Sequence, residues 1–285
     1  MSQLSEKLAA GEFVVTAEIA PPKGVSLEQE LSLAQTLAPL VTAINVTDNQ
    51  GANLRMAPLA AAALLRQRGI EPILQMTCRD RNRMALQSDL LAAAALGIEN
   101  LLLLSGDHPR FGDHPQARPV FDLDSVQLLQ AARTLMAGED LSGRPLQSSP
   151  VFFAGAAVAP EAEPFELMMQ KVHKKAASGA RFFQTQAGFR EAPLLRFMEE
   201  AKPLGVPVIL GVLLLKNARM ARYLNDHIPG VRVPEEIIAR LESAADPLAL
   251  GIELARDLVA LARRHCQGVH LMTLGCEDRI PRILC

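Results

Sequence analysis

The sequence predicts an α/β fold, a single (β/α)8 TIM barrel with parallel strands inside an outer ring of helices. Short apolar runs alternate with segments of helical period along the whole chain of 285 residues. The apolar runs show no polar alternation, which is typical of parallel strands that are covered on both faces. Eight such βα units are present, and this number closes one barrel. We therefore expect residues 1–285 to form one catalytic barrel domain.

The predicted strands are runs rich in apolar and β-branched residues. They are Phe13–Ile19, Val41–Thr47, Ile73–Thr77, Leu101–Leu104, Val151–Ala156, Phe182–Gln186, Val206–Val212 and Val269–Thr273. The C-terminal ends of parallel strands share one rim, where barrel enzymes place their chemistry. Polar residues at these strand ends are therefore the candidates for ligand contact.

The predicted helices have apolar residues at three- and four-residue spacing. They are Leu27–Leu37, Ala57–Arg68, Asn82–Ala95, Ser125–Met136, Glu161–Ser178, Ala192–Ala201 and a doubled helical region from Ala218 to Arg264. Glycine follows several of them and proline stands near the start of one, which is the usual punctuation of helix ends. These residues are Gly69, Gly97, Gly179, Gly205 and Pro234.

An open doubly wound sheet is the alternative fold. Such a sheet usually carries a glycine-rich phosphate loop after its first strand. Here the first strand is followed by Ala20-Pro21-Pro22-Lys23-Gly24, a rigid turn without that cradle, so the barrel is preferred. The segment His108–Leu123 is polar and rich in proline. It follows the fourth predicted strand, where it could wall or cover a ligand.

Composition favours a small-molecule ligand. The formal net charge is -2 and there is no long Lys or Arg block, which argues against nucleic acid and membrane surfaces as partners. No apolar leader opens the chain and no apolar run reaches membrane-spanning length, so we expect a cytoplasmic protein. The four cysteines and six histidines are scattered. We expect reduced thiols, a packing role for Cys78 and no metal site.

Two carboxyl groups stand where chemistry would need them. Glu18 lies inside an otherwise apolar strand, and an acid in such surroundings keeps its proton closer to neutral pH, as a general acid requires. The alternative is a strand-end carboxylate paired with Lys or Arg. Asp107 follows Gly106, which lets the backbone approach a ligand. Its alternative is a helix-capping or turn aspartate.

Amides and hydroxyls complete the predicted rim. Gln184 and Gln186 end the sixth strand and offer donors and acceptors to the edge of a heterocycle, although either could simply satisfy loop backbone. The other polar residues at strand ends are Thr47, Asp48, Asn49, Gln75 and Thr77.

Taken together, these segments resemble the methylenetetrahydrofolate reductase family, flavin-containing barrels of one-carbon metabolism. The likeness runs over nearly the whole chain and rests on the order of its motifs at successive strand ends. The motifs are Thr16-Ala17-Glu18-Ile19-Ala20-Pro21-Pro22, Asn45-Val46-Thr47-Asp48-Asn49, Gln75-Met76-Thr77-Cys78-Arg79-Asp80, Leu104-Ser105-Gly106-Asp107, Lys175 through Gly179-Ala180, and Gln184-Thr185-Gln186.

The resemblance implies reduction of 5,10-methylenetetrahydrofolate to 5-methyltetrahydrofolate, with reduced flavin passing hydride to the folate methylene carbon. Glu18 matches the general acid, Asp107 the aspartate near flavin and pterin, and Gln186 the folate-contacting glutamine, with Gln184 beside it as a second substrate contact. The flavin is FAD, with FMN as the other form. Its expected contacts are Thr47, Gln75, Ser105, Gly106, Asp107, Phe121, Ala157 and Lys175, the last suited to a phosphate.

The chain departs from the family pattern at three places. Family members commonly have Arg before the Gly-Asp pair and His at the third strand, where this chain has Ser105 and Gln75. A Tyr-Pro turn after the fifth strand is replaced by Ala157-Val158-Ala159-Pro160. From residue 199 onward the single aromatic residue is Tyr223, so a nicotinamide has little to stack on.

Three functions are compatible with the sequence as a whole. The leading one is the flavin-dependent reductase, with either NADH or NADPH or a partner protein as electron donor. The others are a flavin-free, pterin-binding methyltransferase or lyase, and a subunit of a multisubunit reductase that receives electrons from a partner. A homo-oligomer or a hetero-complex fits each of them.

Overall fold

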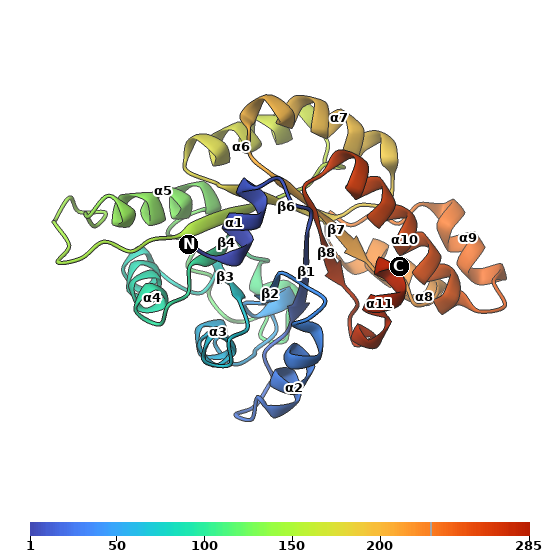
Figure 1. The fold of residues 1–285 in the computed structure, drawn as a ribbon, viewed down its shortest axis with the longest axis horizontal. Helices are drawn as coiled ribbons and strands as arrows, with labels where there is room; N and C mark the ends of the chain where they lie inside the picture. The colour runs from blue at the N-terminus through green and yellow to red at the C-terminus, as the bar shows by residue number, and fades with distance from the viewer. Residues whose placement is uncertain (229) are drawn as a thin grey trace.

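The computed structural model describes residues 1–228 and 230–285. Eight strands form a closed barrel in chain order, and every neighbouring pair is parallel. The predicted TIM barrel is therefore confirmed (Figure 1). The strands are β1 (Val14–Ile19), β2 (Ala43–Val46), β3 (Pro72–Thr77), β4 (Asn100–Leu104), β5 (Phe153–Val158), β6 (Phe182–Ala187), β7 (Val208–Leu213) and β8 (Gly268–Met272).

Helices surround the strands, and all predicted helical segments are present in the described chain (Figure 1). They are α2 (Glu28–Leu37), α3 (Pro58–Gln67), α4 (Arg83–Ala95), α5 (Ser125–Met136), α6 (Phe165–Ala177), α7 (Glu191–Ala201), α8 (Ala218–His227), α9 (Glu235–Ser243) and α10 (Pro247–His265). Short elements add to them, namely α1 (Gln3–Ala9), α11 (Ile280–Leu284), and the 3-10 turns η1 (Gln50–Ala52), η2 (Pro109–Phe111), η3 (Lys202–Leu204) and η4 (Glu277–Arg279).

One expectation needs correction. The region from Ala218 to Arg264, predicted as two helices, contains three. The helix start expected at Pro234 is confirmed, since Pro234 is the N-cap residue of α9. The extra break separates α9 from α10, which Asp246 caps. Helices α8 and α9 pack on the ends of β6 and β7 in a separate apolar cluster that includes Leu213, Leu224 and Ile238.

Side-chain caps fix where several helices begin. Asp124 caps α5 in a reciprocal capping box with Gln127, and Asn82 caps α4 by accepting from Ala85 N at 3.0 Å. Each such cap satisfies a backbone donor that the helix leaves without an internal partner, and each contributes about 1 kcal/mol. The caps of α4 and α5 lie just after the loops that follow β3 and β4. They hold the ends of these loops in place at the rim.

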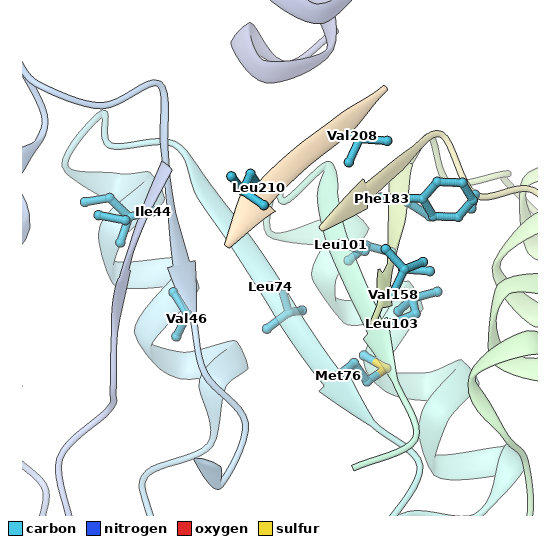
Figure 2. Close-up of a cluster of buried hydrophobic side chains, with 14 of the residues drawn as sticks. Ile44, Val46, Leu74, Met76, Leu101, Leu103, Val158, Phe183, Val208 and Leu210 are labelled. Atoms are coloured by element: carbon cyan, nitrogen blue, oxygen red, sulfur yellow. The ribbon is translucent and has the colours of Figure 1, made fainter. Parts of the chain in front are cut away.

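The main core lies between the barrel and its helices. Alternate residues of the strands point outward into it, including Ile44, Leu74, Leu103 and Phe183. Figure 2 shows these side chains along β2 to β7. Each fully buried aliphatic or aromatic side chain of this kind stabilises the fold by about 1.5–3 kcal/mol relative to exposure.

The side chains inside the barrel change from apolar to polar along its axis. At the N-terminal end of the strands the interior is apolar, where Ile73, Leu102, Phe182 and Ile209 pack together. Helix α1 closes this end with its leucines. One step toward the C-terminal end, the interior residues are polar and buried, namely Thr16, Asn45, Gln75, Gln184 and His270. This polar layer is the floor of the candidate site.

Candidate active site

A cavity of about 530 Å³ opens at the C-terminal ends of the strands, a volume in the range of small-ligand sites. Most of the predicted site residues line it. Those that do are Glu18, Gln75, Ser105, Gly106, Asp107, Ala157, Lys175, Gln184 and Gln186. Thr47 is buried behind the wall, and Phe121 lies on the outer loop, 37% exposed; neither lines the cavity. The structure thus brings the two predicted acids, Glu18 and Asp107, to one cavity.

Glu18 has polar partners on both carboxylate oxygens. Gln50 Nε2 donates to Oε1 at 3.3 Å, and His270 Nε2 lies 3.4 Å from Oε2. The side chain is 11% exposed. In the described residues its titratable partner is the His270 ring, and it makes no ion pair with the Lys or Arg of the alternative reading. Its immediate surroundings are therefore polar, whereas the strand sequence indicated apolar ones.

His270 is fixed by the buried layer beneath it. Its Nδ1 lies 2.9 Å from Thr16 Oγ1 and 3.3 Å from Asn45 Nδ2. An amide nitrogen can only donate, so Nδ1 is the acceptor and Nε2 carries the ring hydrogen. This hydrogen is directed at Glu18 Oε2.

The same layer joins the amides of three strands. Gln75 Nε2 donates to Asn45 Oδ1 at 3.2 Å, and Asn45 Nδ2 lies 3.3 Å from Gln184 Oε1. The three amides are coupled in orientation, and the orientation that directs Asn45 Nδ2 toward Gln184 and His270 is the one that puts the ring hydrogen of His270 on Nε2. The floor of the cavity is therefore one connected hydrogen-bond network.

Asp107 stands on a sharp turn after β4. Gly106 has a φ of 88°, and a Cβ atom there would lie 2.9 Å from Thr77 Cβ, so glycine is required by both backbone and space. Asp107 is exposed, and the N-cap of the following turn is His108, so Asp107 does not have the capping role of the alternative reading. The buried guanidinium of Arg79 lies 3.4 Å from the Asp107 carbonyl oxygen. Glu18 and Asp107 therefore sit in different surroundings, one enclosed and one open to water.

One wall of the cavity is cationic. Lys171 and Lys175 of α6 both line it, and Lys175 Nζ donates to the carbonyl oxygen of Ala157 at 2.6 Å. Burial lowers the pKa of Lys175, and the positive charge of Lys171 lowers it further. Ser125, at the N-terminus of α5, lines the same wall. The two ammonium groups suit an anionic group such as a phosphate, and the carboxylate of Asp124 that caps α5 acts on Lys175 from the other side of this wall.

A buried carboxylate ties the ends of β2 and β3 together. Asp48 accepts from Thr77 N at 2.8 Å and from Thr77 Oγ1 at 2.9 Å, and it pairs with Arg81. The Asp48 side chain is 2% exposed. All three contacts fall on Oδ2, so this oxygen holds the ends of β2 and β3 together at the rim of the cavity that Asp48 lines.

The loop after β4 packs on the loop after β2. Asp113 pairs with Lys23 at 2.6 Å and accepts from Leu54 N at 3.0 Å. These contacts hold the pKa of Asp113 below its usual range, with the Lys23 hydrogen bond as the largest cause. The segment His108–Leu123 is thus attached through Asp113 to the loops that follow the first two strands, and none of its residues lines the cavity.

Two residues that contact Glu18 were not predicted from the sequence. They are His270 and Gln50. His270 pairs in register with Thr16 across the β1–β8 seam, and its position inside an apolar strand was a usable signal. Gln50 belongs to an irregular turn whose direction no sequence pattern indicates. Within residues 1–228 and 230–285, no group of His, Cys, Asp and Glu could hold a metal ion, and no helix could span a membrane.

Known proteins with related sequences are reductases of folate metabolism. The chain is 26% identical to 5,10-methylenetetrahydrofolate reductase of Salmonella typhimurium over 285 residues, which is 95% of this chain and 90% of the relative. It is 26% identical to methylenetetrahydrofolate reductase (NADH) 1 of Arabidopsis thaliana over 229 residues, covering 75% of this chain. The match covers 38% of the length of the plant protein.

Solved structures with this fold include a barrel from Clostridium thermocellum described as binding two copies of 5-methyl-5,6,7,8-tetrahydrofolic acid. It aligns with a TM-score of 0.65 at 14% identity, covering 98% of this chain and 96% of that one. An oxaloacetate acetylhydrolase aligns with a TM-score of 0.56 at 12% identity, covering 98% and 82%. At such identity these likenesses support the fold alone. The sequence model of methylenetetrahydrofolate reductase, however, matches residues 3–285, and the chain belongs to this family.

Proposed function

We propose that this chain catalyses the flavin-dependent reduction of 5,10-methylenetetrahydrofolate to 5-methyltetrahydrofolate. The observation that carries the proposal is that Glu18 and Asp107 line one cavity in a chain of the methylenetetrahydrofolate reductase family. Two carboxyl groups in different surroundings can divide the roles of acid and fixed negative charge. The folate ligand described for the Clostridium thermocellum barrel supports the same class of substrate.

Glu18 is the proposed general acid. It delivers a proton to N10 of the folate, the bond between N10 and the methylene carbon breaks, and its electron pair stays on N10. The methylene carbon is left as an iminium cation on N5, ready to accept hydride. His270 holds Glu18 Oε2 at 3.4 Å, so the carboxyl group keeps one orientation through this step.

Asp107 is the proposed electrostatic partner. Its exposed carboxylate would favour the cationic iminium over the closed ring. Gln186 and Gln184 are the proposed folate contacts. Gln184 uses its Oε1 on Asn45, which leaves its NH₂ group to the cavity.

The residues at the cationic wall fit a flavin phosphate. Lys171 and Lys175 supply positive charge, and Gly106 presents bare backbone beside Ser105. Bound flavin would supply the hydride that reduces the folate methylene carbon. Both FAD and FMN carry the phosphate that these groups suit, and FAD is the proposed form.

The electron donor is proposed to be NADH, NADPH or a partner protein. No Phe, Tyr or Trp of the described chain lines the cavity, so a nicotinamide ring would lack an aromatic side chain to stack on. This observation favours including a protein donor in the test. It also keeps a partner-fed reductase subunit as the second candidate function.

Visible absorption of the purified protein tests the proposal. We expect a yellow protein that is bleached by NADH, NADPH or a reduced protein donor, and whose colour returns with methylenetetrahydrofolate. A protein that stays colourless with added FAD or FMN would contradict flavin dependence and favour the flavin-free methyltransferase or lyase.

Two matched variants test the acid. Glu18→Gln should bind and reduce flavin normally and lose the folate half-reaction by about 10²-fold or more. Glu12→Gln is the control, because Glu12 is exposed just before the opposite end of β1. Equal rates of the folate half-reaction in the two variants would contradict the assignment of Glu18 as the general acid.

A further inference from the structure

Gln50 is a residue to which the proposed function assigns no role. Its side chain is exposed, and its Nε2 lies 3.3 Å from Glu18 Oε1, the oxygen that His270 does not reach. Gln50 also lines the cavity. The amide therefore lies beside the proposed acid at the wall of the same cavity.

Glu18 in this arrangement has an N–H donor beside each of its oxygens, one from Gln50 and one from His270. Donors on both oxygens favour the charged form over the acid. A general acid must instead carry an O–H group on one oxygen. One of the two partners must then stop donating.

His270 cannot make this change easily. Its Nδ1 faces the amide hydrogens of Asn45, which fixes the remaining hydrogen on Nε2. Gln50 can make it, because rotation of the terminal amide exchanges the positions of its nitrogen and oxygen. After this rotation Gln50 Oε1 would accept the proton of Glu18 instead of opposing it.

We propose that Gln50 is a positioning residue that follows the protonation state of Glu18. It donates to the Oε1 atom of the ionised carboxylate, and with its amide reversed it accepts from the O–H group on the same atom. Oε1 is then the oxygen that takes a proton from solvent and passes it to N10 of the folate. This catalytic consequence rests on the proposed function, whereas the coupling of Gln50 to Glu18 does not.

The backbone conformation of the turn restricts where the Gln50 side chain can lie. Asn49 and Ala52 have positive φ values of 44° and 60°, which cost energy for residues other than glycine and persist only where the surroundings enforce them. Asn49 Oδ1 accepts from Arg55 N at 2.8 Å, and Asn49 Nδ2 lies 3.4 Å from Asp80 Oδ2. Strained backbone on both sides of Gln50 thus places its side chain over Glu18.

The charged groups around Glu18 remain the same when Gln50 is changed. His270 of β8 is the titratable side chain that contacts Glu18. The other ionisable groups that line the cavity are Asp48, Arg79, Asp107, Glu163, Lys171 and Lys175. A substitution at Gln50 leaves all of them in place, so a change in the titration of Glu18 reports the loss of the amide.

Gln50→Met tests the proposal, because methionine keeps the length of the side chain and removes both hydrogen-bonding atoms. The probe is the infrared carbonyl band of the protonated carboxyl group, assigned by its absence in Glu18→Gln and followed against pH without flavin or folate. We expect the band to appear at a pH about one unit higher in Gln50→Met, since a donor to the charged form is lost. Gln50→Glu should shift it further upward, because two carboxyl groups then share the site.

Gln67→Met is the matched control, since Gln67 is exposed at the far end of α3. Titration of Glu18 at the same pH in the Gln50 and Gln67 variants would overturn the proposal. In the reconstituted enzyme, the alkaline limb of the folate half-reaction should move with the infrared band while flavin reduction stays unchanged. If the band shifts but no variant, nor the unmodified protein, reacts with folate, it is the proposed function that fails.

Discussion

Gly112 offers a steric test of how the rim loops support the site. A Cβ atom at Gly112 would lie 1.9 Å from the carbonyl oxygen of Ala52, against 3.4 Å for an ordinary contact. One loop must therefore retreat by roughly 1.5 Å, the difference between the two distances. Because Ala52 is two residues from Gln50, we expect Gly112→Ala to pull the amide away from Glu18.

The expected cost in stability is about 1–3 kcal/mol, the usual range for forcing an extra methyl group into a packed contact. Gly112 has a φ of -104°, so alanine adds no backbone strain. Gly24→Ala is the matched control, because a Cβ atom at Gly24 would meet no atom within 4 Å. Urea unfolding of both variants measures the difference in the free energy of unfolding.

The titration of Glu18 should change when the loop that carries Gln50 moves. In Gly112→Ala the titration of Glu18 should resemble that of Gln50→Met, whereas Gly24→Ala should match the unmodified protein. Equal stability of the two alanine variants, together with unchanged titration of Glu18, would refute the packing of these loops described above.

Three further outcomes follow from the geometry. Asp48→Asn should lower the free energy of unfolding in urea by about 1.5–3 kcal/mol, because it removes the charge that Thr77 and Arg81 donate to, while Arg81 keeps its ion pair with Asp89. Burial raises the pKa of the Cys78 thiol to about 12, so a thiol reagent at pH 8 should modify exposed Cys285 and spare Cys78 until the protein unfolds. Hydrogen bonding to Arg83 lowers the pKa of Asp122 from 3.8 to about 2. Its stabilisation is therefore complete above about pH 4 and lost as the pH falls toward 2, and Asp122→Asn should flatten unfolding curves over that interval.

The fold was predictable from sequence because the strand signal is local. An apolar run such as Leu101–Leu104 is too short for a helix and too apolar for an exposed strand, and the structure places β4 there. The separation of α9 from α10 depended on a three-residue break within a region of continuous helical period. Helix α1 was not predicted from the sequence, because its burial depends on the closed barrel. Its Leu4 and Leu8 are buried only because the open end of the barrel accepts them.

The site was predictable in part. Glu18 and Asp107 meet because parallel strands bring their C-terminal ends to one rim. The contact between Glu18 and His270 depends instead on the closure of the barrel, which pairs Thr16 with His270 in register. The contact with Gln50 depends on left-handed backbone at Asn49, Gly51 and Ala52. Asparagine and glycine favour this conformation and indicate a turn, but they do not indicate where the Gln50 side chain lies.

The buried polar layer explains why Glu18 can hold a fixed geometry at an open cavity mouth. An apolar layer of equal volume would stabilise the barrel more, since every buried amide must recover the hydrogen bonds that it loses to water. Gln75, Asn45 and His270 recover them from one another. Moving any one of them leaves another unsatisfied, so the layer resists displacement as a unit. Glu18 is attached to this unit through His270 on one oxygen, while the other oxygen meets a loop. The rigid side can then orient the acid, and the side toward the loop can respond to its proton.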